Sequence, residues 1–195
     1  MKRSTLYIIG ITFLKISFAI QVILLMLNLA NLYAPLFTRK FSWAQVFKDN
    51  IIYTYYVTVG TCATQFFMIW LLSLQNASNS GGKVICLLLV FAFLVYNNWY
   101  LVDIIKYKVA LQPTDILRLA EFGIMFLILV AILTNSKILG TICAVFIIAL
   151  TIYNLSVLSK LIDVISKPLA IGVMLAEALY GLGIALCLFS IEKKV

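Results

Sequence analysis

Histidine is absent from this sequence of 195 residues, and several kinds of site are excluded with it. They are bis-histidine haem sites, zinc sites with histidine ligands and Ser-His hydrolytic pairs. Neither a GxxxxGK(S/T) loop nor a GxGxxG loop occurs, so a backbone cradle for nucleotide phosphates is not expected. The four cysteines lie singly inside apolar runs, where cysteine acts as a small hydrophobic residue. We therefore expect no metal, no cofactor and no catalytic residues, and predict that the protein is not an enzyme.

Charged residues are also scarce, at 11% of the sequence against about 25% in a typical soluble domain. Hydrophobic residues make up 64%, and the mean hydropathy is +1.11. The formal net charge is +8, but most basic residues stand at the ends of apolar runs, where they would meet lipid headgroups. No basic patch with interleaved aromatic residues occurs, so nucleic acid is not an expected partner. The composition is typical of a protein whose main partner is the lipid bilayer.

The apolar residues form continuous runs about 20 residues long, which is the length a helix needs to cross a hydrocarbon core of about 30 Å. Backbone groups in lipid must be hydrogen-bonded within the segment, which favours helices over open strands. We predict an all-α fold, a polytopic transmembrane bundle of about six spanning helices that forms a single integral membrane domain over 1–195. The expected spans are 5–32, 51–74, 84–104, 114–134, 138–159 and 168–191.

The first apolar run is interpreted as a retained membrane helix, because it is too long for a signal peptide and contains Lys15. The longest connection, 33–50, has the composition of a helix lying in the membrane interface around Trp43. Basic residues are almost equally divided between the two sides of the predicted bundle. The positive-inside rule therefore favours neither orientation.

Short sequence matches indicate a candidate duplication, in which spans three and four and spans five and six are copies of one helical hairpin. The offsets between matched residues are 57, 55 and 56, so the register holds within two residues. The copies are separated by an even number of spans, which makes this a parallel repeat. The matches are Tyr96-Asn97 with Tyr153-Asn154, Pro113 with Pro168, and Leu119-Ala120-Glu121 with Leu175-Ala176-Glu177.

Four charged residues inside the expected spans are candidates for a functional role, because a charge at the membrane centre costs about 2.5–3.5 kcal/mol or more. They are Lys15, Arg118, Glu121 and Glu177. In a structural interpretation, Lys15 pairs with Glu177 across two helices, and Arg118 neutralises Glu121 within one helix. In a functional interpretation, Lys15 and Glu177 bind or relay a proton, an ion or a charged substrate.

The second span carries a polar stripe with the spacing i, i+4, i+7, i+11, which places its members on one helix face. That face is expected to avoid lipid, either by hydrogen-bonding to another helix or by lining a cavity. The members of the stripe are Thr54, Thr58, Thr61 and Gln65.

The sixth span is rich in small residues, which allow two helices to approach closely. We interpret them as a helix-packing surface, within the chain or towards another subunit. The residues are Gly172, Ala176, Gly181, Gly183 and Ala185.

Two functional hypotheses follow. In the first, the chain is a non-catalytic multi-pass subunit or accessory component of a membrane complex, with other membrane subunits or further copies of itself as partners. In the second, it is a small transporter or channel that uses Lys15, Glu121, Glu177 and the polar stripe. The small amount of chain expected outside the membrane favours the first hypothesis, because little remains for gating or for coupling to nucleotide.

Overall fold

The computed structural model describes residues 4–38, 51–74, 80–97, 106, 113–159 and 167–191. Within these ranges the chain forms six long helices and no strand, which confirms the prediction of an all-α fold. Each helix overlaps one expected apolar run. The helices are α1 (Thr5–Thr38), α3 (Ile51–Ser73), α4 (Ser80–Asn97), α6 (Pro113–Thr134), α7 (Lys137–Ser159) and α8 (Lys167–Phe189).

The first helix departs most from the sequence-based boundaries. It was expected to end at residue 32, but α1 continues to Thr38 and includes Pro35. A proline within a helix removes one backbone hydrogen bond and crowds the carbonyl four residues earlier, so a helix through Pro35 is not what sequence rules favour. The rest of the interfacial segment expected over 33–50 lies outside the described residues, as does the part of the third expected span beyond Asn97.

Three helices are long and apolar enough to cross a membrane. The qualifying segments are Thr5–Met26 of α1, Lys137–Ser156 of α7 and Ile171–Phe189 of α8. The other three helices contain shorter apolar segments, at Cys62–Ser73, Gly81–Ala92 and Phe122–Thr134.

Helix ends are defined by local capping. The Ser4 hydroxyl accepts a hydrogen bond from the backbone N–H of Tyr7 at 3.2 Å, which caps the start of α1. Between α6 and α7, Asn135 has a left-handed φ of 49°, and the N–H of Ser136 donates to the Ala131 carbonyl at 3.2 Å. This is the pattern of a helix C-cap in which the chain reverses within a few residues. The two helices therefore form a tight helical hairpin.

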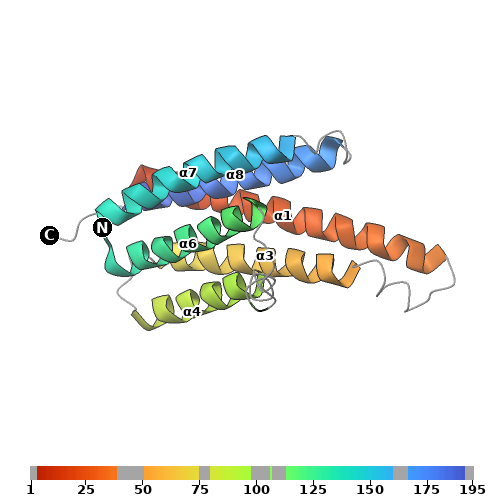
Figure 1. Ribbon diagram of the computed structural model, residues 1–195, viewed down its shortest axis with the longest axis horizontal. Coiled ribbons are helices and arrows are strands. Elements are labelled where there is room, and N and C mark those ends of the chain that lie inside the picture. The colour runs from red at the N-terminus through yellow and green to blue at the C-terminus, as the bar shows by residue number, and fades with distance from the viewer. Residues whose placement is uncertain are drawn as a thin grey trace.

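The helices run lengthwise beside one another (Figure 1), and their contacts form a closed ring of neighbours. Each helix packs against the next described helix along the chain, and the ring is closed by the contact of α1 with α8. The closest packing joins α1 to α8 and α7 to α8, and the contact between α4 and α6 is the smallest in the ring. This arrangement gives every helix one face towards the centre and one face away from it.

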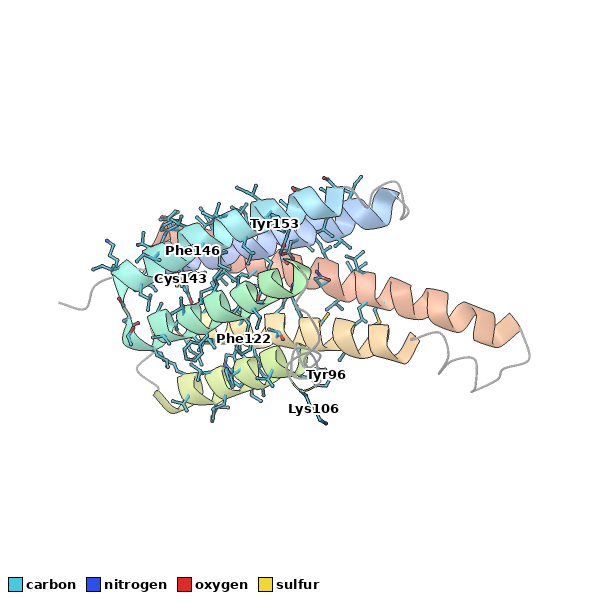
Figure 2. The ribbon with its side chains drawn as sticks, in the orientation of Figure 1. Tyr96, Lys106, Phe122, Cys143, Phe146 and Tyr153 are labelled. Atoms are coloured by element: carbon cyan, nitrogen blue, oxygen red, sulfur yellow. The ribbon has the colours of Figure 1, made fainter. Side chains whose placement is uncertain are left out.

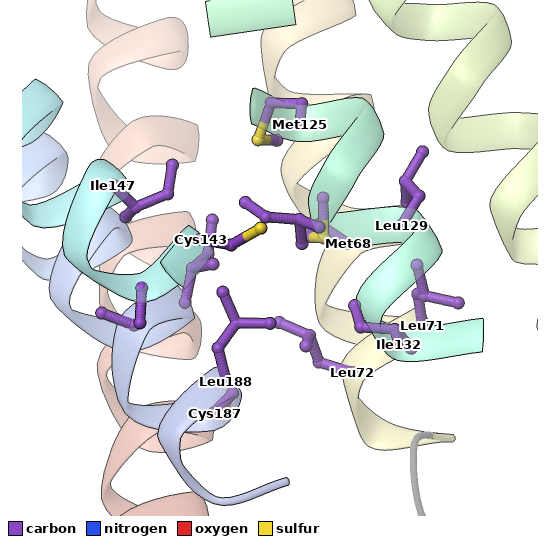
Figure 3. Close-up of a cluster of buried hydrophobic side chains, with 14 of the residues drawn as sticks. Met68, Leu71, Leu72, Met125, Leu129, Ile132, Cys143, Ile147, Cys187 and Leu188 are labelled. Atoms are coloured by element: carbon purple, nitrogen blue, oxygen red, sulfur yellow. The ribbon is translucent and has the colours of Figure 1, made fainter. Parts of the chain in front are cut away.

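The apolar core fills the end of the bundle where the two termini lie (Figure 1). All six helices contribute to it, and side chains from α3, α6, α7 and α8 converge at its centre (Figure 3). Its fully buried members include Leu14, Met68, Leu71, Leu72, Cys86, Val90, Ile128, Ile132, Cys143, Ile184 and Leu188.

The outward faces are also apolar. Phe146 of α7 is 54% exposed and Ile138 at the start of the same helix is 77% exposed, and such side chains point away from the bundle along its length (Figure 2). Contiguous exposed apolar surface of this extent is rare in soluble monomers and normal where lipid is the solvent.

Candidate functional site

The contact between α1 and α8 sets the relative position of the two helices. Gly10 and Gly183 face each other at their crossing, and a Cβ on Gly10 would lie 2.8 Å from the Gly183 carbonyl oxygen. Further along, the Ser17 hydroxyl donates a hydrogen bond to the Ala176 carbonyl at 2.7 Å. The two helices are therefore antiparallel, with Ser17 level with Ala176.

The contact between α7 and α8 is equally close. A Cβ on Gly181 would overlap the side chain of Thr151, whose hydroxyl donates to the Ile147 carbonyl of its own helix at 2.7 Å. One turn away, the amide Nδ2 of Asn154 donates to Oε1 of Glu177 at 3.2 Å. Asn154 is thus level with Glu177, and both side chains are half-buried.

The helix α3 joins the same level of the bundle from the other side of α1. The rings of Phe18 and Phe66 are 6.0 Å apart, centroid to centroid, so this part of α3 is level with the middle of the α1 span. Gln65, next to Phe66, is 3% exposed, and Thr64 is 6% exposed.

These contacts define a polar layer across the bundle, consisting of Ser17, Thr64, Gln65, Thr151, Asn154 and Glu177. Its members come from four helices, and the layer lies farther from the termini than the apolar core. In the described part of the chain, all four buried polar residues belong to this layer. Polar groups buried in an apolar surrounding are costly unless they are hydrogen-bonded, so their collection at one level has to be explained by internal bonding or by function.

Gln65 differs from the other members of the layer. Its side-chain oxygen Oε1 is buried and has no hydrogen-bond partner among the described residues. A buried carbonyl left unbonded costs about 1–3 kcal/mol. The carboxylate of Glu177, the amide of Asn154 and the amide of Gln65 supply acceptor and donor groups suited to a proton, a water molecule or a small cation.

Lys15 is not part of the layer, although it lies at the same level of the bundle. Its side chain is exposed, and it forms no hydrogen bond or ion pair with another described residue. The interpretation in which Lys15 pairs with Glu177 is therefore wrong for the described structure. One residue corresponds to about 100° of helix rotation, and Leu14 already faces Gly183 of α8, so Lys15 points away from α8.

The remaining residues singled out by sequence are distributed as follows. Gly172, Ala176, Gly181, Gly183 and Ala185 all lie in α8, where Gly183 meets α1 and Gly181 meets α7. A Cβ on Gly172 would lie 3.3 Å from the Leu24 side chain of α1. Ala176 and Ala185 are buried.

Of the polar stripe on α3, only the side chain of Gln65 is described. The side chains of Thr54, Thr58 and Thr61 lie outside the described set, as do those of Arg118 and Glu121 in α6. The pairing proposed between Arg118 and Glu121 and the cavity proposed for the stripe therefore stay predictions.

Sequence reasoning missed Ser17, Thr64 and Thr151 as members of a common layer. Single hydroxyl residues are frequent in membrane helices, and nothing in their spacing distinguishes these three. Asn154 was noticed only through the candidate repeat. Within the described ranges, no group of three or more His, Cys, Asp or Glu residues could hold a metal ion.

The apolar outer faces and the three helices able to cross a bilayer are those of an α-helical membrane protein. No protein-family model, curated protein or solved structure matches the chain.

Proposed function

We propose that the protein is a non-catalytic, multi-pass subunit or accessory component of a membrane complex. One observation supports this most directly. Lys15 is exposed on the outer face of α1, in the middle of a segment able to cross a membrane.

The position of Lys15 makes an unpartnered state in lipid unfavourable. It stands about 15 Å of helix from Thr5 and slightly more from Met26, the ends of the apolar segment. The four-carbon stem of a lysine is far shorter than this distance, so the ammonium cannot reach either interface by snorkelling alone. A cation at the bilayer centre costs about 2.5–3.5 kcal/mol or more, which a partner subunit would relieve.

The proposal includes about six membrane-spanning helices, three more than the segments that meet the length and hydropathy criteria. Support comes from the ring arrangement, in which α3, α4 and α6 run alongside the three longer apolar helices (Figure 1). The duplicated hairpin remains part of the proposal, with Pro113 and Pro168 both in the first turn of a helix.

A small transporter or channel is the second candidate function, because the polar layer includes a buried amide oxygen without a partner among the described residues. A translocated proton or cation would satisfy Gln65 and interact with Glu177 during transport. Lys15 points outward. The transport function therefore depends on the polar layer inside the bundle, and Lys15 does not contribute to it.

The experiment that tests the proposal is purification of the tagged full-length protein from its native membrane in mild detergent, followed by mass spectrometry. Recovery with a stoichiometric membrane partner supports the subunit function. Recovery of the chain alone or as a homo-oligomer contradicts the hetero-complex form and favours transport, which a flux assay in proteoliposomes with Glu177→Gln would then measure.

A further inference from the structure

We propose that the exposed face of α1 around Lys15 docks one transmembrane helix of another protein, and that this helix carries an aspartate or glutamate near its middle. The inference rests on the proposed subunit function. It adds the place of contact and the chemistry of the partner.

The docking surface, called the Lys15 face, follows the spacing i, i+4, i+7, i+11, i+18 along α1. All five of its side chains are exposed, and Ile8 and Met26 at its two ends are 53% and 61% exposed. Residues at these spacings form one stripe on a helix. The stripe consists of Ile8, Thr12, Lys15, Ala19 and Met26.

The opposite side of α1 is already occupied. Gly10, Leu14 and Ser17 contact α8, and the hydroxyl of Tyr7 donates to the Leu72 carbonyl of α3 at 3.1 Å. The helix is thus held in place by its own bundle, and its rotation presents Lys15 outward. A partner can bind the Lys15 face without displacing these contacts of α1 with α3 and α8.

The chemistry of this face selects a carboxylate. The Thr12 hydroxyl already donates to the Ile8 carbonyl at 2.8 Å. The Lys15 ammonium has no counter-charge and no hydrogen-bond acceptor among the described residues. A lipid phosphate lies at the interface, about 15 Å of helix away. A carboxylate on a partner span at the same depth would neutralise the ammonium where the low dielectric strengthens the attraction.

The small side chain next to Lys15 on this face permits a partner helix to approach α1 closely. Ala19 lies one turn from Lys15 on the same face and is exposed. Small residues at a helix surface allow a second helix to come near enough for a short lysine–carboxylate contact. The large apolar residues at the two ends of the face would pack against the same partner helix.

A second copy of this chain fits the face poorly. A two-fold symmetric contact through one surface places equivalent residues near each other, which would bring the two Lys15 ammonium groups together. Among the carboxylates whose side chains the structure describes, Glu177 lies inside an expected span, and it is half-buried and bonded to Asn154 in its own bundle. A carboxylate from a different protein meets the requirement without these conflicts.

The first measurement locates the partner. A photo-crosslinking amino acid is placed at Ala19 in the full-length protein in its native membrane, with a matched insertion at Val145, which is 57% exposed on α7. We expect a specific adduct with another membrane protein from position 19 and not from position 145. An adduct that contains only this chain overturns the proposal, as does a crosslinked span without an acidic residue.

The second measurement tests the charge. Lys15→Met should lower partner recovery at least about tenfold, because truncating one member of a desolvated charge pair speeds dissociation. Lys15→Arg should retain the partner, and Lys15→Glu combined with a lysine in place of the partner's acidic residue should restore it. Lys137→Met is the matched control, since Lys137 is exposed at the start of α7 and outside the Lys15 face.

The outcomes separate this proposal from the proposed function. Undiminished partner recovery with Lys15→Met overturns the docking surface and leaves the subunit function standing. Absence of any partner from the unmodified protein removes both. Equal loss of partner recovery with Lys137→Met also overturns the docking surface. Partner binding would then depend on the total positive charge of the protein and not on the position of Lys15.

Discussion

Gly10 and Gly183 approach each other so closely that each lacks room for a side chain. A Cβ on Gly183 would lie 2.9 Å from the Gly10 carbonyl oxygen and 2.7 Å from Cγ of Leu14. Backbone atoms on both sides cannot move aside without separating α1 from α8. Because the contact of α1 with α8 closes the ring of helices, a side chain at either glycine would disturb that closure.

Gly183→Ala should therefore destabilise the protein by about 1–3 kcal/mol, the usual cost of overpacking. Thermal unfolding of the purified protein in detergent measures the change. Gly123→Ala in α6 is the matched control, because a Cβ there meets nothing within 4 Å. A glycine replaced by alanine in an open helical position should be neutral or stabilising by about 0.5–1 kcal/mol. Equal effects at the two positions would disprove the close approach.

Gly181 and Thr151 form a second size-matched pair, between α8 and α7. Gly181→Ala should lower the unfolding temperature, because the new Cβ would overlap the Thr151 side chain. Thr151→Ala in the same protein removes Oγ1 and Cγ2 and should restore part of the loss. A double-mutant cycle of unfolding free energies measures this coupling, and strictly additive effects would show that the pair does not touch.

The hydrogen bond from Asn154 to Glu177 predicts unequal effects of two substitutions. Glu177→Gln keeps a side-chain oxygen that can accept the bond, so we expect little loss of stability. Glu177→Leu leaves the Asn154 amide without this acceptor and should cost about 1–3 kcal/mol. Unfolding in lipid nanodiscs compares the variants, and equal stability of the two would argue against the bond.

Gln65 and Ser17 should respond in opposite directions. Gln65→Leu removes a buried oxygen without a partner and should leave stability unchanged or raise it. Ser17→Ala removes the bond to the Ala176 carbonyl and should cost about 0.5–1.5 kcal/mol. Thermal unfolding of the two purified variants measures both changes in stability. Strong destabilisation by Gln65→Leu would indicate a structural partner for Gln65 and weaken the transport alternative.

Lys15→Met should favour membrane insertion of the first span. Removing a cation from the middle of an apolar segment is expected to improve the apparent insertion free energy by about 2.5–3.5 kcal/mol. A glycosylation-based insertion assay with the Thr5–Met26 segment measures it, with Ile16→Met as the neutral control. An unchanged insertion efficiency would place Lys15 away from the centre of the membrane.

The helices and their approximate bounds were predictable from sequence because each corresponds to an apolar run, and in α1, α7 and α8 that run is long enough to cross a membrane. The same reasoning identified the small residues of α8, since close helix approach needs glycine or alanine whatever the partner is. It did not reveal which helices Gly181 and Gly183 would meet, because that depends on the order of helices around the ring.

The position of Lys15 shows most clearly what sequence alone cannot predict. Its presence in an apolar run is a property of the sequence, and so is the energetic need for a partner. Whether it faces Glu177 or points outward depends on the rotation of α1, which is set by the contacts of Gly10, Leu14 and Ser17 with α8. Sequence spacing gives each residue's place on its own helix, but only packing between helices decides which faces meet. The amino-acid sequence alone therefore determined the helical class and the presence of a charge in the middle of an apolar run. The tertiary structure decided that Ser17, Gln65, Asn154 and Glu177 lie inside the bundle at one level, whereas Lys15 at the same level faces outward.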